Sequence, residues 1–124
     1  MEAGGFELLA ASLRADARDL DVFFDALATK LAAAFPESTK VERDGFRGRG
    51  PVRAVEVELG ERRYAVERAA GGTKTTRATS VRGIVLKNEQ LALDEWIDEL
   101  SRDLAETAER TERGRVALER MLNE

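Results

Sequence analysis

Few side chains in this chain could do chemistry, because it contains no cysteine and no histidine. Thiolate nucleophiles, imidazole bases, disulfides and the usual zinc sites are therefore excluded. Asp94, Glu95, Asp98 and Glu99 form pairs four residues apart, a spacing that suits general acid–base work or a hard cation. Acidic first turns are also routine in helices, because they complement the helix dipole, and we prefer that interpretation. We expect a protein that is not an enzyme and has no cofactor or metal.

Basic side chains are the stronger candidates for a binding site. The net charge of −4 divides unevenly along the chain, at −4 for residues 1–39, +6 for residues 40–87 and −6 for residues 88–124. Arginine predominates in the basic middle, and its planar guanidinium suits bidentate contact with carboxylate or phosphate. The charge pattern therefore predicts a basic surface for an anionic partner.

We expect the partner-binding surface to combine a sheet face with a glycine-rich loop. Its predicted residues are Phe46, Arg47, Arg49, Arg53, Arg63 and Arg77. The alternative is that the arginines pair within the molecule, with Glu56, Glu58 and Glu67 or with the acidic helices. A charged, exposed sheet face is ordinary in antiparallel sheets, so both interpretations stay open.

A β-hairpin in the middle of the chain must position these residues. Apolar and charged residues alternate with period two on both sides of Gly60-Glu61, and a Gly-X loop favours a type II′ turn. The turn predicts the cross-strand pairs Leu59 with Arg62, Glu58 with Arg63, Val57 with Tyr64 and Val55 with Val66. Tyr64 then lies on the buried face, which argues against a platform that stacks RNA bases.

The other elements follow from periodicity and from proline and glycine. Apolar residues at helical spacing predict a helix over residues 17–35, after a loosely ordered or helical lead-in over residues 1–15. Alternation predicts a short strand over 38–43, and three glycines and a proline predict a mobile loop over 44–51. The threonine-rich segment 73–87 reads as one long strand or as two.

Together these elements predict one α+β domain over residues 1–124, a two-layer sandwich. It has an N-terminal helix, an antiparallel meander of three to four strands and a long C-terminal helix. A continuous helix over residues 93–123 would be about 45 Å long, against about 15 to 20 Å for the sheet. We therefore expect the helices to overhang and to form a homodimer.

The run from Val81 to Lys87, with Leu91 and the segment Leu93-Asp94-Glu95-Trp96, resembles a family of small uncharacterised proteins from high-GC Gram-positive bacteria. The resemblance implies a cytoplasmic bacterial protein and supplies no site residue. A cytoplasmic location is also expected because no apolar run approaches a membrane span and the first residues do not resemble a signal peptide.

The leading functional hypothesis is a non-enzymatic interaction or adaptor domain. It would present the basic sheet face and the Phe46–Arg49 loop to an anionic protein segment or to a membrane surface. A nucleic-acid-binding protein is the first alternative, since arginines neutralise phosphates. The second is a small acidic chaperone-like dimer that holds an extended client against a strand edge.

Overall fold

The central hairpin forms in the predicted register, between β2 (Val52–Leu59) and β3 (Arg62–Ala69). Gly60 has a φ of 64°, as a type II′ turn requires at its first position. The apolar pairs that face each other across the hairpin are all buried: Val55, Val57, Tyr64 and Val66. The alternation therefore sets one apolar face, which the helices cover.

The sheet contains five strands rather than three or four, in the order β1-β2-β3-β4-β5. The computed structural model describes residues 3–110 and 112–123. The remaining strands are β1 (Thr39–Arg43), β4 (Gly72–Val81) and β5 (Ile84–Leu91). The segment that could be one strand is thus two, because Arg82 and Gly83 both take positive φ values, of 55° and 82°, and turn the chain back.

Two helices precede the sheet, α1 (Ala3–Asp16) and α2 (Leu20–Ala34). The Asp19 side chain caps α2, because it accepts hydrogen bonds from the backbone N–H groups two and three residues further on. The predicted lead-in is the helix α1, and it packs on α2 and α3 with Leu9 and Leu13 fully buried. The N-terminal segment is therefore part of the core.

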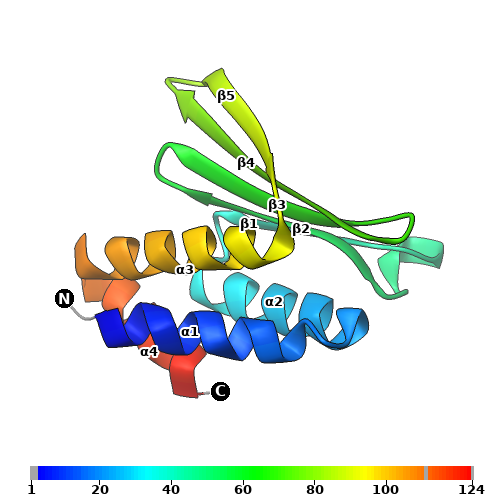
Figure 1. Cartoon of the computed structure of the whole chain (residues 1–124), viewed down its shortest axis with the longest axis horizontal. Coiled ribbons are helices and arrows are strands. Elements are labelled where there is room, and N and C mark those ends of the chain that lie inside the picture. Colours follow the sequence, from blue (N-terminus) through cyan, green and yellow to red (C-terminus); the bar gives the residue numbers. More distant parts are fainter. Residues whose placement is uncertain (1–2, 111, 124) are drawn as a thin grey trace.

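The C-terminal helix is not continuous, which corrects the expectation of a single helix over 93–123. Helix α3 (Leu93–Arg110) is followed by α4 (Glu112–Asn123), which turns back and packs on α1, α2 and α3 (Figure 1). Met121 of α4 is buried. The single helix of about 45 Å that suggested a dimer is thus not formed.

All four helices lie on one side of the sheet, which confirms the predicted α+β architecture (Figure 1). Helices α2 and α3 contact the strands, and α1 lies on their far side. The core between sheet and helices includes Phe23, Phe24 and Leu27 from α2 and Trp96 and Leu100 from α3. Within residues 3–110 and 112–123, no helix combines the length and apolar character that crossing a membrane requires.

Candidate functional site

Three arginines of the sheet point toward the helices and pair there with carboxylates. Arg77 on β4 donates from one nitrogen to Glu99 of α3 at 2.9 Å and from another to Glu89 of β5 at 2.8 Å. Arg62 binds Asp103 of α3, and Arg68 binds an aspartate of α2 at 2.7 Å. Arg77 is therefore not on the open face of the sheet, where it was predicted.

The open face carries both signs of charge. Glu56, Glu67, Lys40 and Lys74 surround a shallow hollow of about 240 Å³ on this face. Arg63 lies on it too, opposite Glu58 in the predicted register. The face is thus not uniformly basic, because Glu56, Glu58 and Glu67 share it with Lys40, Arg63 and Lys74.

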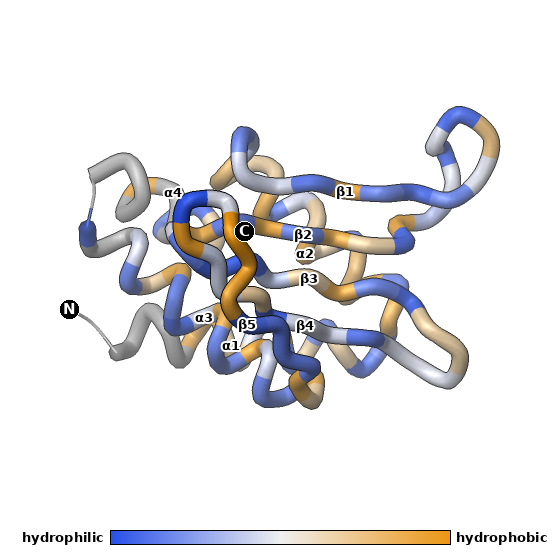
Figure 2. Tube along the Cα trace, turned by 90° about the horizontal axis from the view of Figure 1, so that it is seen from above, coloured by the Kyte–Doolittle hydropathy of each residue, from blue (hydrophilic) through white to orange (hydrophobic). Residues whose placement is uncertain are grey.

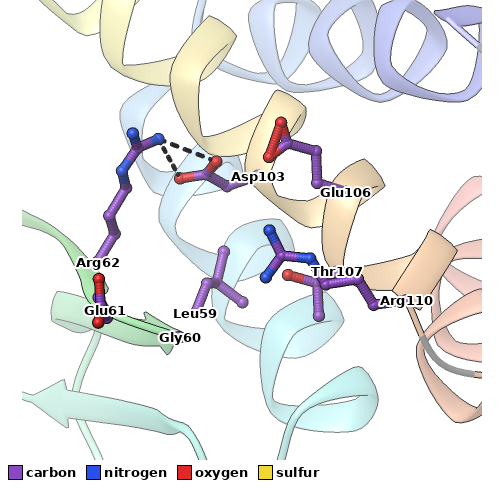
Figure 3. Close-up of a pocket in the computed structure, with 8 residues that line it drawn as sticks. All are labelled: Leu59, Gly60, Glu61, Arg62, Asp103, Glu106, Thr107 and Arg110. Carbon is purple, nitrogen blue, oxygen red and sulfur yellow. Dashed lines mark hydrogen bonds and ion pairs between the residues drawn. The ribbon is translucent and has the colours of Figure 1, made fainter.

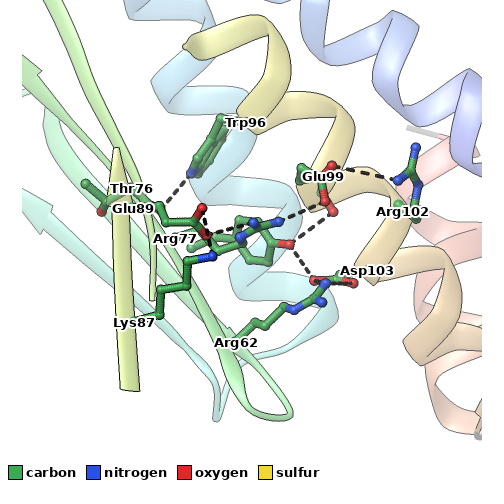
Figure 4. A network of polar contacts seen from close by, with 10 residues as sticks. Arg62, Thr76, Arg77, Lys87, Glu89, Trp96, Glu99, Arg102 and Asp103 are labelled. Atoms are coloured by element: carbon green, nitrogen blue, oxygen red, sulfur yellow. Dashed lines mark hydrogen bonds and ion pairs between the residues drawn. The ribbon is translucent and has the colours of Figure 1, made fainter. Parts of the chain in front are cut away.

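A polar network ties the sheet to α3 beside the core (Figure 4). The Tyr64 hydroxyl donates a hydrogen bond to the buried Asp103 carboxylate, which also accepts from Arg62 at 3.1 and 3.2 Å. The Trp96 indole N–H donates to the Thr76 carbonyl at 3.0 Å. Every buried partner named here has a hydrogen bond, so the network positions α3 on the sheet.

The network shifts the pKa values of its members. Burial, followed by the hydrogen bond to Asp103, raises the pKa of Tyr64 above its usual value. The hydrogen bond to Arg77 lowers the pKa of Glu89, and the same bond raises the pKa of Arg77. The directions of these shifts mean that the folded protein favours the neutral phenol of Tyr64 and the charged pair of Arg77 and Glu89. Such interactions hold secondary-structure elements together.

A polar cavity of about 480 Å³ lies between the β2–β3 turn and the end of α3 (Figure 3). Its polar lining is Glu61, Arg62, Asp103, Glu106, Thr107 and Arg110. Arg62 and Asp103 already bind each other, so a ligand would meet mainly Glu106 and Arg110. The arrangement offers mixed charges and no activated nucleophile.

The acidic start of α3 is used for packing. Arg14 of α1 binds Asp94 at 2.9 Å and also binds Asp98, four residues further along α3. These hydrogen bonds raise the pKa of Arg14. Within the described residues, no group of three acidic side chains is placed to hold a metal ion. The two carboxylates spaced four residues apart on α3 thus form ion pairs with an arginine of α1.

The predicted site residues Phe46, Arg47 and Arg49 do lie together, in the connection between β1 and β2 that we call the arginine loop (residues 44–51). Phe46 is 81% exposed, and the Arg47 guanidinium lies 5.2 Å from the centre of its ring. Arg49 is exposed as well. Among the residues that the structure describes, no carboxylate forms an ion pair with Arg47 or Arg49. The tip of the loop is therefore apolar and cationic.

Backbone hydrogen bonds close the arginine loop on itself. The Gly50 N–H donates to the Asp44 carbonyl at 2.6 Å, and the Asp44 N–H donates to the Pro51 carbonyl at 3.0 Å. A Cβ on Gly50 would collide with the Asp44 carbonyl oxygen, so only glycine allows this close approach. Arg53 pairs with Asp44 at 3.3 Å and with Glu42, and so braces the base of the loop.

Arg47 adopts the left-handed backbone conformation, with a φ of 61°. L-residues other than asparagine and aspartate rarely adopt it, and such residues cluster at ligand clamps and other functional sites. The short 3-10 turn η1 (Phe46–Gly48) thus holds Arg47 and Phe46 outward in one arrangement.

No family model matches this chain, and no curated protein or solved structure matches it significantly. The resemblance seen in Val81–Trp96 stays a prediction. Of the six predicted site residues, three form the loop tip, Arg53 braces its base, and Arg63 and Arg77 lie elsewhere on the sheet. Sequence reasoning allowed for arginines that pair with the acidic helices, but it named neither Arg14 nor Asp103.

Proposed function

We propose that this protein is a non-enzymatic, cytoplasmic interaction domain whose arginine loop binds an acidic segment of a partner protein. The observation that carries the proposal is the exposed Phe46 beside Arg47 and Arg49. Arg62, Arg68 and Arg77, by contrast, are neutralised inside the molecule. The loop is thus a concentrated basic and apolar feature on a surface of otherwise mixed charge.

The chemistry of the loop fits carboxylates next to an apolar side chain. Two guanidinium groups can each bind a carboxylate through paired hydrogen bonds, and Phe46 can cover a neighbouring apolar residue. The closed backbone holds these groups in place before binding, which lowers the entropy lost when the complex forms. An acidic segment with one or two apolar residues is the matching ligand.

A protein partner fits better than a membrane or a nucleic acid. One phenylalanine contributes little insertion energy, and stable membrane attachment takes a second signal. Strong phosphate binding requires several free cations along a duplex, whereas most arginines of the sheet are paired. Lipid and nucleic acid are therefore competing outcomes of the test.

The test measures fluorescence anisotropy of a short labelled peptide of glutamates interspersed with leucines. Replacing Arg47 and Arg49 together by Ala should weaken binding about tenfold or more, because hydrogen bonds to charged groups contribute about 1.5 kcal/mol or more each and about 1.4 kcal/mol is tenfold. Replacing Lys40 and Lys74 by Ala removes the same charge from the open face and should change little.

Two further probes make the result decisive. Phosphatidylserine vesicles and a short RNA duplex are titrated under the same conditions at increasing ionic strength. Tighter binding of vesicles or duplex than of the peptide, lost in the loop variant, would replace the protein partner by a lipid or nucleic-acid one. Equal peptide affinity in the loop variant and the lysine control would remove the loop from the function.

A further inference from the structure

The two edges of the sheet differ in a way that points to assembly. β1 has five residues, and Lys40, Glu42 and Arg43 expose charges along it. β5 has eight residues, and its first three are apolar and exposed: Ile84 at 65%, Val85 at 50% and Leu86 at 65%. Short, charged edges resist further pairing, whereas a long apolar edge invites another strand.

Among the residues that the structure describes, no strand pairs with the outer edge of β5. β5 pairs with β4 and is the last strand of the sheet, and it stands at the margin away from α1 and α2 (Figure 1). β5 has apolar residues at both ends, 84–86 and 91, and polar residues 87–90 between them (Figure 2). A strand that reads similarly in both directions suits antiparallel pairing with a copy of itself.

We propose that β5 is a homodimer interface, where it pairs antiparallel with β5 of a second copy around a two-fold axis at Asn88. A two-fold axis through an antiparallel pair places one residue opposite its own mate, since opposed residues share a face of the sheet. With Asn88 on the axis, Lys87 of each copy lies opposite Glu89 of the other. Opposite charges at directly paired positions stabilise a register.

The neighbouring registers are disfavoured by charge. An axis at Lys87 or at Glu89 places each of these residues opposite its own mate, so like charges meet. An axis at Gln90 would run the pairing into α3, which begins at Leu93. An axis at Leu86 would centre the pairing on the irregular position of β5, where the register with β4 shifts. Asn88 is thus the centre that the charges select.

The same register also uses the apolar residues. Lys87 and Glu89 lie on the helix-facing side, where Glu89 meets Arg77, and the Lys87 ammonium is already 3.5 Å from its own Glu89. Two copies would therefore form a small alternating charge cluster across the axis. In this register residues 84–86 lie opposite residues 90–92 of the second copy, so the exposed apolar start of β5 forms the two ends of the interface.

Cysteine crosslinking tests the register directly, because the chain has no cysteine of its own. In Asn88→Cys the two sulfur-bearing residues face each other, with Cα atoms about 4.5 to 5.5 Å apart, inside the range for a disulfide. In the control Gln90→Cys the two positions are four residues apart along the strands, about 13 Å, which is too far. Both residues are exposed on the same strand.

The expected result is a disulfide-linked dimer for Asn88→Cys and a monomer for Gln90→Cys on non-reducing gels after mild oxidation. Light scattering of the unmodified chain should give twice 13.7 kDa. Lys87→Glu should shift the dimer toward monomer, whereas Lys74→Glu, an equal charge change away from the edge, should not.

Three outcomes overturn this interface. One is a monomer at all concentrations, another is equal crosslinking of both cysteine variants, and the third is a dimer that Asn88→Cys does not link, as a helical interface would give. The loop variant at Arg47 and Arg49 should dimerise normally, and Lys87→Glu should still bind the glutamate peptide. Failure of one proposal is therefore distinguishable from failure of the other.

Discussion

Replacing Tyr64 by Phe should destabilise the fold through the network between β3 and α3. The ring stays in place, so the change removes only the hydroxyl that donates to the buried Asp103 carboxylate. A hydrogen bond to a charged group contributes about 1.5 to 3 kcal/mol. Because Asp103 keeps its contact with Arg62, we expect the lower end, a loss of about 1.5 kcal/mol.

This loss converts to a shift in melting temperature. The entropy of unfolding is about 2.1 cal/mol/K per residue, so the 124 residues have about 0.26 kcal/mol/K and Tm should fall by about 6 °C. The only tryptophan, Trp96, is buried with its ring centre 6.2 Å from that of Tyr64. The fluorescence of Trp96 therefore reports urea unfolding of the contact between α3 and β3.

A double mutant and a titration test the role of the Tyr64 hydroxyl. Combined with Asp103→Asn, Tyr64→Phe should cost less than it does alone, because its partner is already altered. An equal cost in both backgrounds, or a cost below about 0.3 kcal/mol, would refute the coupling. Tyr64 is also the only tyrosine, so tyrosinate absorbance titrates it alone.

The same tyrosine also makes the stability of the fold depend on pH in the alkaline range. The folded pKa of Tyr64 is raised above the value of 10.0 that an unfolded chain would show. The stabilisation is therefore complete below pH 10.0 and is lost as the pH rises toward the folded pKa. Tyr64→Phe should remove this alkaline loss, and a native midpoint near that of the urea-unfolded chain would contradict the burial argument.

Two other substitutions test separate features. Arg82→Asn should stabilise the β4–β5 turn by roughly 0.5 to 1 kcal/mol, because Asn tolerates the positive φ of 55° better than Arg; an unchanged or lower Tm would contradict this. Glu89→Gln should reduce the loss of stability in acid. Its pKa is lowered from 4.5 by the bond to Arg77, so its stabilisation is present above pH 4.5 and fades as the pH falls through the folded pKa; thermal melts with the same acid slope in both proteins would oppose it.

The parts of the fold that could be predicted are those that depend on neighbours in sequence. The Gly60 turn and the period-two pattern were enough for the hairpin register, and the apolar spacing predicted α2 to within three residues at its start and one at its end. Burial of Tyr64 followed from the same register. Local chemistry specifies these features because turn and cap act over two or three residues.

The remaining features depend on how distant elements dock. Alternation along β3 places Arg62 on the same face as Tyr64. The local sequence does not predict that Asp103 of α3 forms an ion pair with Arg62. The sequence has no glycine or proline between Arg110, where α3 ends, and Glu112, where α4 begins, so it gives no sign of the reversal there. Likewise the hydrogen bonds that close the arginine loop join backbone groups, so the side-chain pattern gives no sign of them.

The arginine loop and the β5 edge lie at opposite margins of the five-stranded sheet. In a dimer joined through β5, the two loops would lie at opposite corners of a ten-stranded sheet, separated by roughly 40 Å across the strands alone at about 4.8 Å per strand. A partner with two acidic segments that span this gap would engage both loops, and its second binding event would become intramolecular. Such bivalence raises avidity by about a hundredfold or more without any new contact. The dimer would then select partners by the spacing of their acidic segments as well as by their charge.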